Sequence, residues 1–178
     1  LIVDRIATPG VMAAKLLLPW GSATDGVGQR GARQLLAATL SRGCGPFDHR
    51  QLADLVEGRG AGLRSDAHED GLLISLRCTT EDAQELMPLL DWMVTAPHLA
   101  TEQLELERSL SLQALQRQGE DPFHLAIDQW RQLVYGSTGY GHDPLGVRDD
   151  LQQLDNRVLQ ALARQLTTGR AVLAISGT

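Results

Sequence analysis

Residues 31–42 constrain the fold more than any other stretch of the chain. Apolar residues recur there at helical spacing, which predicts a helix that turns one stripe toward a core. The stripe consists of Ala32, Leu35, Leu36, Thr39 and Leu40. Gly43 then supplies a left-handed stop. The opposite face, which holds Gln34, Ala37, Ala38 and Ser41, carries no charge. A face turned to solvent would normally be charged, so we expect a second element to pack closely against it.

Composition narrows the class of protein. The 178 residues are 43% hydrophobic and 21% charged, which is typical of one soluble globular domain over residues 1–178. The net charge of −6 argues against a nucleic-acid partner. The longest apolar run, residues 11–20, is interrupted by Lys15 and Pro19 and is too short to span a membrane. Because the sequence begins with Leu, we interpret it as a fragment of a longer chain.

Two cysteines, Cys44 and Cys78, give no disulfide framework and favour a reducing compartment such as the cytoplasm. Neither has a signature of reactivity. Cys44 follows a predicted helix end, where no helix dipole lowers the pKa of a thiol.

Segments rich in Leu, Ile and Val predict strands at residues 1–6, 11–18, from 63 onward, 71–78 and 171–176. Thr8-Pro9-Gly10 predicts a turn between the first two, and residues 67–70 predict a hairpin turn. Further helices are expected at residues 48–57, from Thr79 or Thr80 to about 96, and at 102–118, 122–134 and 155–165. Leu106, Leu110 and Ala114 lie on one face of the helix at 102–118. In the helix at 122–134, the expected core residues are Leu125, Trp130 and Leu133.

Residues 20–43 resemble the first metal helix of the insulinase and mitochondrial-processing-peptidase family, the inverzincins. In that family a strand closing with Gly-Ser leads through an acidic residue and a Gly-rich loop into a His-x-x-Glu-His helix. Gly21-Ser22, Asp25 and residues 26–28 follow the same order here.

Alignment on Gly43 places the first metal-binding His of the family at Gln34, the catalytic Glu at Ala37 and the second His at Ala38. The resemblance continues in residues 107–122, which are similar to the family's second metal helix. There the third zinc ligand falls at Ala114 and its acidic neighbour at Gln113.

The resemblance covers nearly the whole chain. It implies an α+β fold with a mostly antiparallel sheet of about five or six strands and helices packed on one face, the LuxS/processing-peptidase-like metallohydrolase fold. A catalytic zinc needs three protein ligands. Gln34 offers only a weak donor, whereas Ala38 and Ala114 offer none. We therefore expect no catalytic residue, no metal and no cofactor in this domain, with zinc confined to an active partner domain.

Other chemistry is weakly supported by the sequence. The five histidines show no metal-ligand spacing; they are His49, His68, His98, His124 and His142. Residues 58–62 are rich in glycine, but they follow a helix, which is the wrong order for a phosphate-binding loop.

The resemblance implies a catalytically inactive domain that acts in assembly and in peptide or partner binding. Its partner would be an active peptidase half or subunit, or a second copy in a homo-oligomer, with a peptide as a possible substrate. One alternative is that the chain belongs to an active zinc metalloendopeptidase whose intact motif lies in another domain or subunit. A second alternative is a structural scaffold subunit of a larger complex.

Overall fold

A five-stranded mixed sheet organises the computed structural model, which describes residues 1–5 and 10–177. The strands are β1 (Ile2–Arg5), β2 (Val11–Leu18), β3 (Gly62–Ala67), β4 (Leu72–Thr79) and β5 (Val172–Gly177). Their spatial order is β1-β5-β2-β4-β3. Only β1 and β5 run parallel, so the predicted mostly antiparallel sheet is confirmed.

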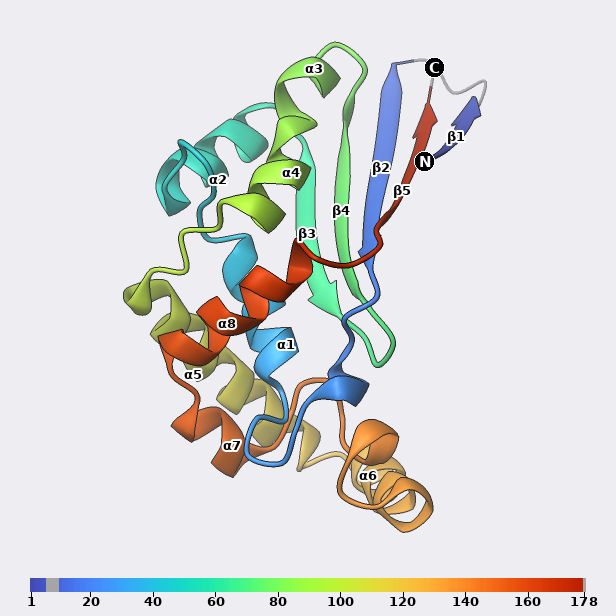
Figure 1. Ribbon diagram of the computed structural model, residues 1–178, viewed down its shortest axis with the longest axis vertical. Helices are drawn as coiled ribbons and strands as arrows, with labels where there is room; N and C mark the ends of the chain where they lie inside the picture. The colour runs from blue at the N-terminus through green and yellow to red at the C-terminus, as the bar shows by residue number, and fades with distance from the viewer. Residues whose placement is uncertain (6–9, 178) are drawn as a thin grey trace.

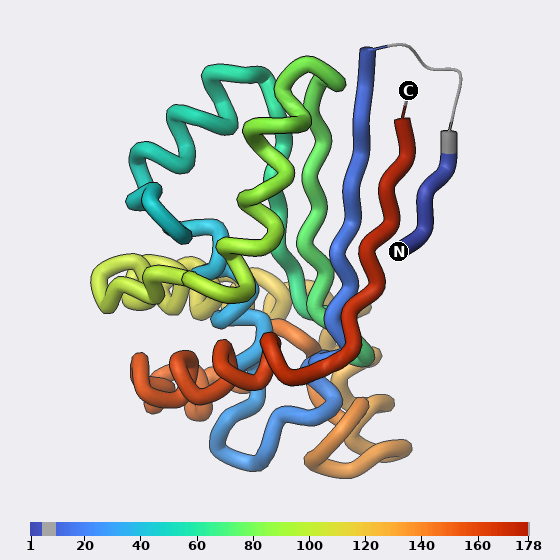
Figure 2. The backbone as a smooth tube through the Cα atoms, turned by 45° about the horizontal axis from the view of Figure 1, so that its top comes forward, coloured from blue at the N-terminus to red at the C-terminus, as the bar shows by residue number. Residues whose placement is uncertain are grey.

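Helices cover one face of this sheet and leave the other face bare (Figures 1 and 2). The burial of β2 and β4 alternates accordingly, because successive side chains of a strand point to opposite faces. Met12, Ala14 and Leu18 are buried on the covered side, whereas Lys15 and Leu17 are exposed on the other.

The first two strands form as predicted, but they do not pair with each other. β5 lies between them, hydrogen-bonded in parallel to β1 and antiparallel to β2. The predicted end of the first strand at Ile6 and the Thr8-Pro9 part of the predicted turn lie outside the described residues. The predicted hairpin is confirmed: β3 and β4 pair directly, with Ala67 opposite Leu72.

Eight α-helices are described: α1 (Ala32–Leu40), α2 (His49–Gly58), α3 (Ala83–Leu86), α4 (Pro88–Thr95), α5 (Thr101–Gln118), α6 (Pro122–Tyr135), α7 (Arg148–Gln153) and α8 (Asn156–Leu166). Short 3-10 turns occur at Ser22–Thr24 and Gly139–Gly141. α1 lies at the centre of the helical layer, where it contacts β3, α5 and α8 (Figure 1). No helix among the described residues is long and apolar enough to cross a membrane.

The predicted stripe of the first helix is confirmed, since all five of its residues are buried. α1 ends at Leu40, two residues earlier than predicted. Ser41 is its C-cap, so the predicted stop at Gly43 is wrong, although Gly43 has a positive φ of 129° in the loop that follows. α2 begins as expected, with the Asp48 side chain accepting from the backbone N–H of Arg50 and Gln51.

The helix predicted from Thr79 or Thr80 to about 96 is divided in two. α3 ends at Leu86 and α4 starts at Pro88, because proline has no N–H to donate to the preceding turn. Asp82 occupies the N-cap position, and the predicted Thr79 contributes through its hydroxyl, which accepts from the Asp82 backbone N–H at 3.1 Å. The loop predicted before the last helix also contains α7, which the sequence pattern missed.

The predicted core residues of α6 are wrong, and Leu106 and Leu110 do not lie on the buried side of α5. On α5 the side that carries Leu106 and Leu110 is half exposed, and the buried residues include Gln103, Glu107 and Ser111. On α6 no residue is buried. Its expected core residues Leu125, Trp130 and Leu133 are exposed by 45%, 52% and 86%. Figure 1 shows why these α6 side chains are exposed: the helix projects from the lower edge of the molecule, away from the sheet.

Candidate functional site

The uncharged face of α1 packs against α5, as the absence of charge predicted. An ion pair joins the two helices at one end of their contact, where Arg42 Nε donates to Glu107 Oε1 at 2.5 Å. At the other end Gln34 and Gln118 line the same hollow. The two helices therefore run antiparallel. We call their contact the seam: it lies between the uncharged face of α1 and α5, and the Arg42–Glu107 ion pair marks one end of it.

The residues at the predicted metal positions lie along or beside this seam. Gln34 and Ala38 on α1 are half-buried, and so is Ala114 on α5, whereas Ala37 is fully buried in the core. Gln34 has a structural partner, because its Oε1 accepts a hydrogen bond from the backbone N–H of Ala67 at 2.7 Å. Its side chain thus fastens the end of strand β3 to α1.

These residues do not fit a zinc ion. Alanine has no donor atom, and the one amide oxygen present is already engaged by Ala67. Among the residues that the structure describes, no three His, Cys, Asp or Glu side chains converge as a metal site. His68, which the sequence placed in a solvated turn, is exposed beside the hollow and has no such companions. The assignment of Gln34, Ala37, Ala38 and Ala114 to former ligand positions stays a prediction, since it rests on sequence alignment.

The hollow at the open end of the seam has a volume of about 410 Å³ and a mixed charge. Arg131 of α6 enters it and pairs with Glu69 at 3.0 Å, and it also donates to the carbonyl of His142 at 3.1 Å. Asp66 and Asp143 add two carboxylates to the wall. Sequence reasoning missed this group, because its members come from three separate segments and no motif links them.

A buried ion pair sets the position of α1. Asp25 accepts from Arg33 Nη1 at 2.6 Å and from the backbone N–H of Gly31 at 3.0 Å. Burial raises the pKa of Asp25, and the hydrogen bond from Arg33 opposes that rise. The sequence marked Asp25 as the acidic residue before a Gly-rich loop. The structure adds its partner Arg33, the second residue of the helix that the loop precedes.

Two glycines bring the loop before α1 into backbone contact with the loop before α7. Gly31 and Gly146 have positive φ values of 97° and 106°. A Cβ atom on Gly146 would lie 2.5 Å from the Gly31 Cα, so neither position tolerates a side chain. Arg30 completes the junction by donating from Nε and Nη2 to the two carboxylate oxygens of Asp150, at 2.8 and 3.0 Å. The hydrogen bond from Arg30 lowers the pKa of Asp150.

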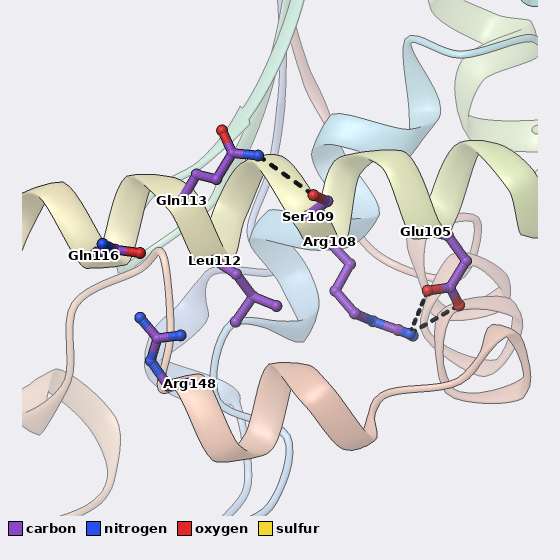
Figure 3. A pocket seen from close by; sticks show the side chains of 7 residues that line it. All are labelled: Glu105, Arg108, Ser109, Leu112, Gln113, Gln116 and Arg148. Atoms are coloured by element: carbon purple, nitrogen blue, oxygen red, sulfur yellow. Dashed lines mark hydrogen bonds and ion pairs between the residues drawn. The ribbon is translucent and has the colours of Figure 1, made fainter.

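Gln113 points away from the seam. Figure 3 shows it on the outer side of α5, with Nε2 directed at Ser109 Oγ at 3.5 Å. It lines a separate hollow of about 270 Å³ between α5 and the start of α7, together with Arg148. Neighbouring residues 113 and 114 therefore face different surroundings, which makes them a matched pair for substitution.

The fold of this chain is similar to that of peptidase M16 domains. No protein-family model and no curated protein matches the sequence. The likeness is found with solved structures. The structure superposes with a TM-score of 0.87 on the peptidase M16 inactive domain from Pseudomonas fluorescens, at 23% identity. It superposes with a TM-score of 0.87 on a protease from Helicobacter pylori, at 15% identity.

A third similar structure is the periplasmic protease PqqL from Escherichia coli, with a TM-score of 0.86 and 12% identity. Each of the three superpositions covers 98% of this chain, but only 43%, 43% and 20% of the respective neighbours. The chain thus spans less than half the length of these proteins. At these identities the likeness concerns the fold, and the resemblance inferred from the motifs is confirmed at that level.

Proposed function

We propose that this chain is a catalytically inactive peptidase-like domain that works in assembly and in peptide or partner binding beside an active half. One observation carries the proposal. Gln34, Ala38 and Ala114 stand where the alignment predicts the zinc ligands of the resembled family, and none of the three is a strong zinc ligand. We further propose that the domain itself takes no metal or cofactor and that zinc belongs to its partner.

The outer edge of the sheet supports peptide binding. β3 is an edge strand, paired only with β4 among the described strands. Its outward N–H and C=O groups can pair with an extended peptide, a common mode of peptide recognition. The strand ends at the 410 Å³ hollow, which Asp66 and Ala67 help to line. A peptide added to this edge would therefore run toward that hollow, beside Gln34.

Helix α6 supports a role in assembly. Its exposed apolar residues include Phe123 and Leu133, with exposures of 68% and 86%, and Trp130. Large apolar groups gathered on one projecting element are typical of protein interaction surfaces, because isolated soluble domains seldom leave them in water. The partner that we propose is the active peptidase half, with a second copy of this chain as the alternative.

One observation favours the first alternative function. The similar structures are more than twice as long as the matched region. A full-length protein of that size has room for a further domain with an intact His-x-x-Glu-His motif. The chain would then be the silent part of an active zinc metalloendopeptidase. The full-length reading frame separates the two hypotheses directly.

Metal analysis tests the proposal. We expect the purified full-length protein, with any intact motif elsewhere disabled, to contain no stoichiometric zinc and to hydrolyse no peptide. Stoichiometric zinc that is lost on substitution of Gln34 would refute the proposal.

Rebuilding the ligands tests the alignment. Gln34→His, Ala38→His and Ala114→Glu together should bind zinc, because two of the positions are one turn apart on α1 and the third faces them from α5. Gln113→Glu in place of Ala114→Glu is the matched control and should not complete the site. Equal zinc affinity of the two versions would show that the assigned register is wrong.

A further inference from the structure

A cluster of cations lies on the bare face of the sheet, away from the seam. It consists of Lys15 on β2, Arg64 on β3 and Arg77 on β4, hereafter the cation cluster. All three residues are exposed. They line a hollow of about 530 Å³ whose rim includes residues 60–62. Figures 1 and 2 show that no helix covers this face of the sheet.

Strand register explains the hollow. Ser75 of β4 lies directly between Lys15 and Arg64 on the neighbouring strands. Two positions along β4, Arg77 lies between Ala13 and Gly62. Long cationic side chains therefore alternate with small residues on the same face. The small residues form a floor, and the cation cluster surrounds it.

The members of the cation cluster form no ion pairs within the described part of the chain, although eight ion pairs are found there. Asp66 lies on the same face, one pleat along β3 from Arg64, and is not bonded to it. Three exposed, unpaired cations on one face are unexpected in a chain with a net charge of −6. The local charge therefore favours an anionic ligand.

We propose that the cation cluster binds an acidic peptide segment, so that this domain selects peptides by their carboxylates. The proposal rests on the peptide-binding function and specifies its ligand class. Arg77 is diagonal to both Lys15 and Arg64 in the register, a relation that separates side chains by about 7–8 Å. Alternate residues of an extended peptide are about 6.8 Å apart. Two carboxylates at alternate positions of an extended segment therefore match the spacing of either diagonal pair, Arg77 with Lys15 or Arg77 with Arg64.

The negative net charge of the whole chain argues against nucleic acid as the occupant. A nucleic-acid surface needs a long basic track to displace counterions, and this face offers three cations in one hollow. Peptide carboxylates need no such track, since each forms its own charge-assisted hydrogen bonds with a guanidinium or ammonium group.

Fluorescence anisotropy with a labelled twelve-residue peptide tests the proposal on the full-length protein. The probe has Glu at alternate positions, and its two controls carry Gln or Lys at those positions. We expect the Glu peptide to bind more tightly than either control, and its binding to weaken as salt rises. Lys15→Gln, Arg64→Gln and Arg77→Gln together should weaken binding by about tenfold, the product of three exposed charge contacts.

Three exposed arginines on the helical side form the matched control: Arg50, Arg157 and Arg164, each changed to Gln. This control variant has the same net charge as the cation-cluster variant, but it should bind the Glu peptide as tightly as the parent protein does. An equal loss in both variants would overturn the proposal, as would equally tight binding of a single-stranded oligonucleotide of the same charge. If the Gln and Lys peptides bind as well as the Glu peptide, the cation cluster is not a selector although peptide binding stands. If no peptide binds, the proposed peptide-binding function fails as well.

Discussion

Replacing Asp25 by Ala should be among the most damaging single changes in this chain. The Asp25 side chain is fully buried, and that of Arg33 is only 9% exposed. The variant would leave the Arg33 guanidinium without its anion and the N–H of Gly31 without an acceptor. Breaking a buried ion pair from one side costs about 3–5 kcal/mol, so we expect a loss of about 4 kcal/mol of unfolding free energy.

For a chain of 178 residues each kcal/mol shifts the melting temperature by about 2–4 °C. The expected decrease for Asp25→Ala is therefore about 8–16 °C by calorimetry, with the free energy obtained from urea unfolding. Glu105→Ala, which removes a 55% exposed carboxylate from its pair with Arg108, is the control and should change stability by less than about 1 kcal/mol.

A double replacement separates the ion pair from the packing. Because burial raises the pKa of Asp25, desolvation offsets much of the attraction of Arg33. Asp25→Leu combined with Arg33→Met should accordingly recover most of the stability that Asp25→Ala loses. A loss below about 1 kcal/mol in Asp25→Ala, or a double variant no more stable than the single one, would refute the reasoning.

Three further predictions concern the junction and the core. Asp150→Asn should lower stability at pH 7. The difference should shrink as pH falls through the lowered pKa of Asp150, because the contribution of its carboxylate is lost on protonation; urea unfolding across pH measures this. Gly146→Ala should lower the unfolding free energy by about 3 kcal/mol, because the residue has a positive φ and touches the facing loop. Gly28→Ala is the control: it also has a positive φ but faces open space, so it should cost about 1 kcal/mol. Thermal unfolding measures both. Leu36→Ala should cost about 2–5 kcal/mol in the same assay, since Leu36 is fully buried; a shift near zero would place it outside the core.

Sequence periodicity was sufficient to predict the buried residues where one face of a helix meets the core. The stripes of α1 and α8 follow this rule: Leu35, Leu36 and Leu40 are buried on α1, and Leu159 and Leu162 on α8. The cap of α2 was also predictable, because Asp48 bonds to groups two and three residues away. These features depend on neighbours in the sequence, which a pattern contains.

Periodicity failed to predict burial where a residue's packing or ion-pair partner is distant in sequence. On α5 the pattern could not reveal that Glu107 turns inward, since its partner Arg42 belongs to the end of another helix. On α6 the apolar residues were correctly placed in a helix, but a pattern cannot show that the helix projects from the body. The exposure of Trp130 and Leu133 is therefore information that only the structure supplies.

The candidate site was predictable in part. The absence of charge on one face of α1 anticipated the contact with α5. The engagement of Gln34 by Ala67 was not predictable, since it depends on where strand β3 ends. The cation cluster also escaped prediction, because it is created by strand register and no two of its members are close in sequence.

The position of β5 also governs when this sheet can be completed during synthesis. β5 is the last strand of the described chain, yet it separates the first two, and β1 is hydrogen-bonded to no other described strand. On a ribosome, β2, β4 and β3 can associate early, while β1 must wait until residues 172–177 have emerged. The nascent chain therefore holds an unpaired edge for most of its elongation, a period in which a chaperone or a neighbouring chain could occupy the place reserved for β5.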